Sequence, residues 1–203
     1  MKKNNVMDVV FLLDRSGSMG GIEKDTIGGY NGYIKAQKDK NVLVTTVLFD
    51  NYYEMIYERK PISEVKKLDS KTYYVRGCTA LYDAIGKTIK FMDENKSKKV
   101  LFIITTDGFE NSSKEYNKSQ IKELIKGHSN WEFMYIGADI NSYEEGSSIG
   151  IKKDNISNYK KDKKGVSKLF KSIDMASSMY LENECINSNW KEDLENYIEE
   201  NRL

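Results

Sequence analysis

The chain has few of the residues that build zinc, disulfide or redox sites. Its 203 residues include one His and two Cys, too few for a structural zinc site without heavy use of carboxylates. Cys78 and Cys185 lie far apart and form no C-x-x-C motif. A reducing compartment is the simpler interpretation, and one disulfide is the alternative. We therefore expect any metal ion to be held mainly by oxygen.

The net charge of the chain is also small, and arginine is rare. The 32 basic and 31 acidic side chains leave a net charge of +1, so no global field attracts nucleic acid or an anionic membrane. Only four of the basic residues are Arg, the side chain that makes bidentate contacts to phosphate and guanine. We expect no nucleic-acid partner and no membrane partner. The abundance of Lys and Asn favours an AT-rich bacterial or phage genome.

Long hydrophobic runs are missing as well. No apolar stretch approaches the roughly 18 residues of a membrane-spanning helix. The first apolar run is short, is interrupted by Asp8 and lacks the features of a signal peptide. We expect a cytoplasmic protein. A length of about 200 residues fits one α/β domain, and no repeat or linker divides the chain. We predict a single domain over 1–203, with a helix at roughly 188–203 as an extension.

Three continuous apolar runs of strand-forming residues end in Asp, at 6–14, 100–107 and 133–139. Runs of this kind, without strict alternation, are typical of strands buried on both faces of a parallel sheet. Each precedes a segment with helical periodicity, which predicts repeated βα units. A further strand at 41–49 is followed by Asp50-Asn51 and a strand-like run at 52–58. This short link predicts a tight hairpin and therefore one antiparallel strand.

Helices are predicted where apolar residues recur three or four positions apart. The clearest sets are Leu81, Ile85, Ile89 and Met92; Ile121, Leu124 and Ile125; Val166, Leu169, Phe170 and Ile173; and Trp190, Leu194 and Ile198. A weaker helix is expected at 22–38, because Gly28 and Gly29 lower its helix propensity. Eight Lys lie within 152–171 and seven acids within 182–203. These blocks are either solvated faces or an electrostatic docking surface, and the sequence does not decide between them.

The residues with the clearest chemistry follow the predicted strands. The first strand ends in Asp14, and Ser16 and Ser18 follow on a short glycine-containing loop. Asp107 ends a later strand, and Thr79 lies just before a helix. Ligands of doubly wound sheets bind at the carboxyl ends of the strands. Two carboxylates and three hydroxyls there suit a hard cation such as Mg²⁺, with room for water and a further ligand. The alternative for each residue by itself is simpler: Ser16, Ser18 or Thr79 could cap a helix, and Asp107-Gly108 could form an ordinary turn.

In these positions the chain resembles the von Willebrand factor A domain with its metal-ion-dependent adhesion site. The resemblance rests on D-x-S-x-S at 14–18, G-x-T-A-L at 77–81 and T-D-G at 106–108, and spans roughly 6–180. Segments 74–85 and 107–112 look most like the small bacterial stand-alone members. The family implies a Rossmann-like, doubly wound, mostly parallel sheet of six strands in the order 3-2-1-4-5-6, with one antiparallel edge strand and helices on both faces. It also implies the metal ligands Asp14, Ser16, Ser18, Thr79 and Asp107.

Residues beside these ligands carry weaker expectations. Cys78 stands where many relatives have Gly, and we interpret it as a packing residue because thiolate is a poor ligand for Mg²⁺. Arg15 is expected to point to solvent or to a bound acid. Asp83 lies in the first turn of its helix, where a negative charge is favourable, and support of the metal site is the alternative. Glu110 and Asn111 are expected to rim the site.

The resemblance favours a Mg²⁺-dependent protein-binding module without enzymatic activity, with Mn²⁺ or Ca²⁺ as substitutes. The ion would capture an Asp or Glu of a protein partner in an adaptor or assembly role. The alternative is a metal-dependent hydrolase or phosphotransferase that uses the same carboxylates. Against it, Ser16 stands where haloacid-dehalogenase-type enzymes need a second Asp. Phosphate-loop, nucleophile-elbow and dinucleotide motifs are also missing. The sequence defines neither the partner nor the oligomeric state.

Overall fold

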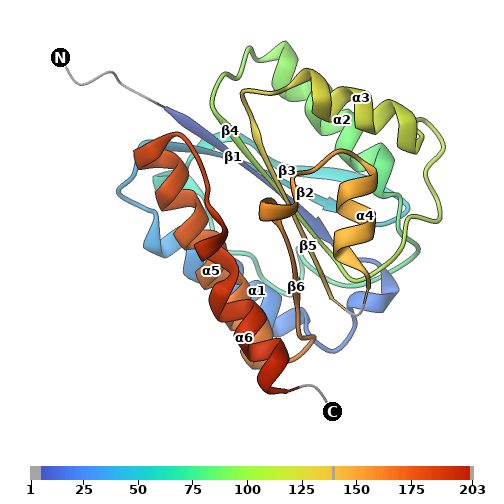
Figure 1. Cartoon of the computed structure of the whole chain (residues 1–203), viewed down its shortest axis with the longest axis vertical. Helices are drawn as coiled ribbons and strands as arrows, with labels where there is room; N and C mark the ends of the chain where they lie inside the picture. The colour runs from blue at the N-terminus through green and yellow to red at the C-terminus, as the bar shows by residue number, and fades with distance from the viewer. Residues whose placement is uncertain (1–5, 139, 202–203) are drawn as a thin grey trace.

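A twisted six-stranded sheet runs through the molecule between two layers of helices (Figure 1). The computed structural model describes residues 6–138 and 140–201. The strand order is β3-β2-β1-β4-β5-β6, and only β2 and β3 pair antiparallel. The strands are β1 Met7–Asp14, β2 Val42–Phe49, β3 Tyr53–Pro61, β4 Val100–Thr106, β5 Glu132–Ala138 and β6 Ile156–Tyr159. The predicted fold class, strand order and antiparallel edge strand are confirmed.

The central strands are buried on both faces, as their apolar runs predict. Every residue of β1 and of β4 is buried. Side chains of a strand point alternately to the two faces, and the core divides accordingly. Phe11 and Leu13 belong to one hydrophobic cluster, and Val10 and Leu12 to the other. The sheet therefore holds the ends of β1 and β4 in a rigid layer with apolar packing on each side.

Each face of the sheet is covered by helices. Residues of α1 (Glu23–Ala36), α5 (Lys163–Asn183) and α6 (Glu192–Glu200) pack in the first cluster. Residues of α2 (Leu81–Glu94) and α3 (Lys118–Gly127) pack in the second, with α4 (Ser142–Ser148) on the same side (Figure 1). Short 3₁₀ turns complete the connections: η1 Gly17–Met19, η2 Ile62–Glu64, η3 Lys153–Asn155 and η4 Ser188–Lys191.

The predicted elements are present within a few residues of their expected bounds. The helix expected at 22–38 forms as α1, and the other spacing patterns correspond to α2, α3, α5 and η4–α6. Our patterns gave no separate prediction of α4 or of β6, which has only four residues. Asp139, expected to end the third apolar strand, lies outside the described residues. No helix within the described ranges is long and apolar enough to cross a membrane.

The basic and acidic blocks near the C-terminus meet in the structure. The basic block runs through η3, β6 and the first half of α5, and α6 carries most of the acidic block. Lys168 of α5 pairs with Asp193 of α6, and Trp190 is buried with its indole donating to the Asp154 carbonyl at 2.9 Å. The C-terminal helix is thereby fixed beside β6 and the loop that follows it.

Candidate metal centre

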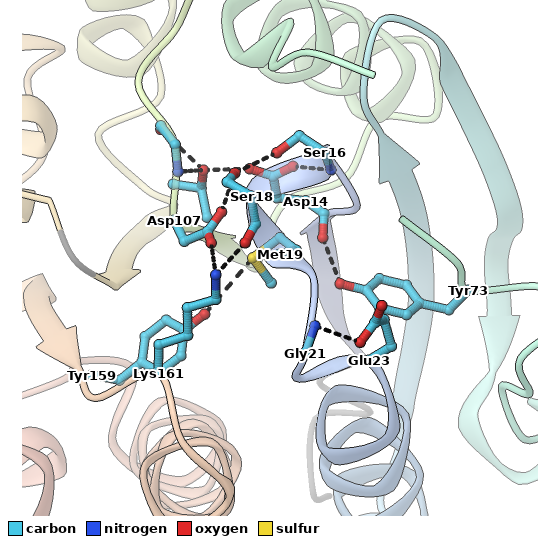
Figure 2. Close-up of polar contacts among 12 residues, drawn as sticks. Asp14, Ser16, Ser18, Met19, Gly21, Glu23, Tyr73, Asp107, Tyr159 and Lys161 are labelled. Carbon is cyan, nitrogen blue, oxygen red and sulfur yellow. Dashed lines mark hydrogen bonds and ion pairs between the residues drawn. The ribbon is translucent and has the colours of Figure 1, made fainter. Parts of the chain in front are cut away.

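The carboxyl ends of β1 and β4 lie side by side and bring together side chains 93 positions apart in sequence. Leu13 is the register partner of Thr105 in the parallel β1–β4 pair, so Asp14 and Asp107 follow at neighbouring strand ends. The loop after β1 turns through η1 and presents Ser16 and Ser18 to the same place (Figure 2). This is the sheet edge at which a doubly wound fold binds its ligands.

The hydroxyls of the candidate site form a chain of close oxygen contacts. Ser16 Oγ lies 3.0 Å from Ser18 Oγ, and Ser18 Oγ donates to Asp107 Oδ1 at 2.5 Å. Thr79 reaches the same point, because a Cβ atom placed on Gly108 would lie 2.8 Å from Thr79 Oγ1 and 3.3 Å from Ser18 Oγ. Glycine at 108 leaves the space that these hydroxyls need. The structure thus brings all five predicted residues to one small region.

Asp14 is the most buried member of the group. Its carboxylate is fully buried and accepts from the Ser16 amide at 2.7 Å and from the Thr106 hydroxyl at 2.5 Å. Burial, with a smaller contribution from the nearby negative charge of Asp107, raises the pKa of Asp14 to about 6 although these hydrogen bonds lower it. A buried carboxylate with a raised pKa is one whose ionised form a cation would stabilise.

The donor set fits a hard divalent cation. Neighbouring ligands of an octahedral Mg²⁺ at about 2.0–2.1 Å lie about 2.9 Å apart, close to the 3.0 Å between Ser16 Oγ and Ser18 Oγ. Within the described residues, no cluster of three or more His, Cys, Asp or Glu could hold a metal. Among the five candidate ligands two are carboxylates, so the hydroxyls of Ser16, Ser18 and Thr79 would have to act as donors. This composition suits Mg²⁺ or Mn²⁺ better than a soft metal.

Several residues that support the site are not among those predicted from the sequence. Thr106 holds one Asp14 oxygen, and the buried Tyr73 donates to the Asp14 carbonyl at 2.6 Å. Lys161, from the loop after β6, places its ammonium 2.9 Å from Asp107 Oδ2. The sequence indicates a role for Thr106, because it directly precedes Asp107. Tyr73 and Lys161 do not adjoin a predicted ligand in the sequence, and the fold brings them to the site.

Glu110 and Asn111, which were expected to rim the site, and Asp83 connect the loop after β4 to the start of α2. Asn111 Oδ1 accepts from the Thr79 amide at 2.9 Å, so it positions Thr79 through the backbone. Glu110 accepts from the Ser113 amide at 2.7 Å and the Tyr82 amide at 2.9 Å. Asp83 accepts from three consecutive amides, those of Lys114, Glu115 and Tyr116. The loop after β4 is therefore fastened to the first turn of α2.

Two expectations about neighbouring residues are wrong. Arg15 points neither to solvent nor to an acid from outside the chain: it is fully buried, and its Nε donates to Asp50 Oδ2 at 2.8 Å. The parallel β1–β2 pairing puts Asp50 beside it, since Asp14 is the register partner of Phe49. Cys78 is an exposed free thiol rather than a packing residue; it follows Gly77, which has a positive φ of +68°, and its amide donates to Asn51 Oδ1 at 2.7 Å. Cys185 is also free and exposed.

Comparison with known proteins identifies the fold. No family model and no curated protein matches the sequence, but solved structures do. The von Willebrand factor domain of the type V pili tip protein Mfa5 from Porphyromonas gingivalis aligns with a TM-score of 0.68 and 10% identity. That alignment covers 89% of this chain and 98% of that one. Proximal thread matrix protein 1 from the mussel byssus aligns with a TM-score of 0.61 and 16% identity over 84% of this chain.

The mussel alignment covers 45% of that protein, so this chain spans less than half of its length. A further structure of the mussel protein has a zinc-occupied adhesion-site motif. Manganese-loaded TRAP protein from Plasmodium vivax aligns with a TM-score of 0.55 and 19% identity, over 82% of this chain and 74% of that one. At these identities the alignments establish the fold and leave the role of the site to its chemistry.

Proposed function

Because this chain has the von Willebrand factor A fold, we propose that it is a metal-dependent protein-binding module. The observation that carries the proposal is the convergence of three hydroxyls and two carboxylates at the ends of β1 and β4. The metal-loaded neighbours support it, since zinc and manganese are recorded in proteins of this fold. We propose Mg²⁺ as the resident ion, with Mn²⁺ or Ca²⁺ as substitutes.

In this proposal Ser16, Ser18 and Thr79 bind the ion through their hydroxyls. Asp14 and Asp107 supply the negative charge, directly or through water. The contacts of Asp14 with the Ser16 amide and Thr106 hydroxyl orient its carboxylate in advance, which lowers the cost of assembling the site. The bound ion supplies positive charge and a coordination position for an oxygen of another molecule. We propose that an Asp or Glu of a protein partner provides that oxygen.

The surface around the site supports a protein partner. Phe109, one residue beyond Gly108, is 55% exposed, and Tyr74 is 42% exposed on the loop that leads to Thr79. Exposed aromatic side chains are enriched at protein interfaces. They would give the contact specificity that a single metal–carboxylate bond lacks.

We propose no catalytic role for the site. Ser16 occupies the position where a haloacid-dehalogenase-type enzyme would need its second Asp. The single histidine, His128, is engaged elsewhere, with its ring nitrogens 2.6 Å from the Leu124 carbonyl and 2.8 Å from Asp93. A hydrolase or phosphotransferase would therefore lack a histidine beside the carboxylates to act as general acid or base.

We further propose that the chain acts as one domain over 1–203 and works in the cytoplasm. The C-terminal helix supports the first point, because Trp190 and Leu194 are buried in the same hydrophobic cluster as β1. The free thiols of Cys78 and Cys185 support the second, because exposed thiols persist best in a reducing compartment.

A Mg²⁺-dependent capture experiment tests the binding function. The protein, immobilised and loaded with Mg²⁺, is expected to retain one or more partners from a lysate of its source and to release them in EDTA. The Asp14→Asn variant should retain none of them. Replacing the acidic residues of a captured partner one at a time should abolish its retention at a single position. Retention that persists in EDTA, or that no single acidic residue controls, would contradict the proposal.

Metal affinity is expected to fall below pH 6. The pKa of Asp14 is raised to about 6 by burial, so at lower pH a divalent ion must displace a proton from the buried carboxyl. A pKa of 6 implies an apparent affinity about tenfold lower at pH 5 than at pH 7. The same raised pKa means that the metal-free fold loses stability as the pH rises from about 4 to about 6, because ionising this carboxyl costs more in the folded chain.

Calorimetric titrations with Mn²⁺ from pH 5 to pH 7.5, in two buffers with different ionisation enthalpies, measure both the affinity and the protons released. We expect about one proton per ion at pH 5 and almost none at pH 7. The Ser18→Ala variant is the control: it keeps Asp14 buried, so its affinity should be lower but follow the same pH course. An affinity that is constant between pH 5 and pH 7 would rule out this role of Asp14.

A further inference from the structure

A positively charged side chain of the protein itself reaches into the candidate metal centre. Lys161 extends from the loop after β6, and its Nζ lies 2.9 Å from Asp107 Oδ2 (Figure 2). The same ammonium donates to the Ser18 carbonyl. Asp107 is thus held on both sides, by the Ser18 hydroxyl at Oδ1 and by Lys161 at Oδ2. One of the two carboxylates proposed to bind the ion already has a cation as its partner.

The loop that carries Lys161 is fixed on both sides of this residue. Lys160 Nζ donates to the Asn201 carbonyl at 3.2 Å. Asp162 caps α5 by accepting from the Gly165 amide at 2.7 Å, and it also accepts from the Tyr197 hydroxyl at 3.1 Å. The Lys160 carbonyl packs so closely on α5 that a Cβ on Gly165 would lie 2.0 Å from it. The backbone at Lys161 is therefore held where its side chain can reach Asp107.

A divalent ion and an ammonium compete for the same carboxylate, because both are positive and repel each other at short range. The Lys161 side chain is 22% exposed and that of Asp107 is 2% exposed, so water screens this repulsion only in part. We infer that Lys161 is a built-in competitor for the metal. Its ammonium neutralises Asp107 while no divalent ion is bound and must leave when one binds, which lowers the affinity of the site. This inference rests on the proposed metal-binding function.

Two variants that each remove one lysine from this loop test the inference. Lys161→Met removes the competing ammonium and keeps a side chain of similar length. Lys160→Met makes the same change in net charge one residue away, where the amine contacts the Asn201 carbonyl instead. Calorimetric titration with Mn²⁺ should show affinity roughly three- to tenfold higher than wild type for Lys161→Met, and wild-type affinity for Lys160→Met.

Thermal unfolding gives a second readout that does not depend on a partner. In EDTA, Lys161→Met should melt below the wild type, because Asp107 loses its counter-ion beside Asp14. On adding Mn²⁺ this variant should gain more in melting temperature than the wild type does. Lys160→Met should show the wild-type gain.

The outcomes separate the competitor role from the metal site itself. If wild type and Lys161→Met bind Mn²⁺ equally, or the variant binds more weakly, the competitor role is wrong and the metal site stands. If neither binds Mn²⁺, both the site and the inference fall. Binding by Lys161→Met alone would support the competitor role most strongly. An equal gain in affinity for Lys160→Met would trace the effect to net charge and overturn the specific role of Lys161.

Discussion

Replacing Asp14 with Asn is expected to lower the affinity for Mg²⁺ and Mn²⁺ by at least about 100-fold. Asparagine has the same size and keeps an oxygen to accept from the Ser16 amide, which lies 2.7 Å from Asp14 Oδ1 in the wild type. The shape of the loop is therefore preserved while one of the two negative charges at the site is lost. With the charge gone, Asp107 remains the only carboxylate among the five candidate ligands, and Lys161 already neutralises it.

The fold should survive this change. Burial makes the ionised form of Asp14 costly, as its raised pKa shows, so a neutral amide relieves a cost that the wild-type protein bears at pH 7. We expect the metal-free Asp14→Asn variant to unfold at a urea concentration equal to or above that of the wild type. Calorimetry with Mn²⁺ measures the affinity, and urea unfolding in EDTA measures the stability. Affinity within tenfold of the wild type would remove Asp14 from the ligand set.

Asp83→Asn is the matched control for a buried carboxylate outside the candidate ligand set. Asp83 is also buried, and hydrogen bonds from three backbone amides of residues 114–116 outweigh the effect of burial and lower the pKa of its carboxyl. Replacing it should therefore destabilise the fold, the opposite of the effect at Asp14. Its metal affinity should stay close to that of the wild type, since its carboxylate accepts from the amides of residues 114–116 rather than from a candidate ligand.

The architecture could be predicted from the sequence because the central strands are buried on both faces. Such strands must be apolar throughout, and β1 and β4 can be recognised from composition alone. β6 could not, because Ser157 and Asn158 interrupt its four residues, and it joins the sheet only through pairing with β5. The same holds for α4, a single short helix of mostly polar residues. Tertiary contacts, which no local pattern records, stabilise both elements.

The candidate site likewise contains residues that could be predicted from the sequence and others that could not. Asp14, Ser16 and Ser18 share one loop, so their spacing is visible in the sequence. Thr79 and Asp107 could be placed with them because parallel strands end at a common edge and the family resemblance supplied the pairing. The partners of these residues come from other layers of the fold. Lys161 in particular is one of eight lysines in its block, and only the position of β6 beside β5 and the fixed loop after it distinguish it from the rest.

Arg15 is the clearest case in which local sequence misleads. An arginine between two polar candidate ligands in a loop looks solvent-exposed, yet its side chain is fully buried. Its guanidinium lies between Asp50 and Glu54, with Nε 2.8 Å from Asp50 Oδ2 and Nη1 2.8 Å from Glu54 Oε2. Asp50 is buried as well, whereas the Glu54 side chain is 51% exposed. The buried pair therefore depends chiefly on Asp50.

Replacing Asp50 with Ala is accordingly expected to destabilise the fold by about 3–5 kcal/mol, the cost of removing the buried partner of a buried charge and leaving it the half-exposed Glu54. For a domain of this size the loss corresponds to a fall in melting temperature of roughly 10 °C. Asp50 also accepts from Arg76 Nε at 2.7 Å and from the Tyr52 amide at 2.7 Å, so the change loosens the β2–β3 turn too. Urea unfolding with and without Mn²⁺ measures the loss of stability and any loss of metal affinity.

Two further variants separate the buried charge from the other contacts of Asp50. Arg76 is 39% exposed, so Arg76→Met should cost no more than about 1 kcal/mol. The double variant Asp50→Ala/Arg15→Met removes both members of the buried pair and should recover a large part of the stability lost in Asp50→Ala. If Asp50→Ala costs less than about 1 kcal/mol, or Arg15→Met worsens it, the Arg15–Asp50 pair does not anchor the loop. The expected pattern would instead show that a buried ion pair between adjacent strand ends stabilises the loop that carries Ser16 and Ser18.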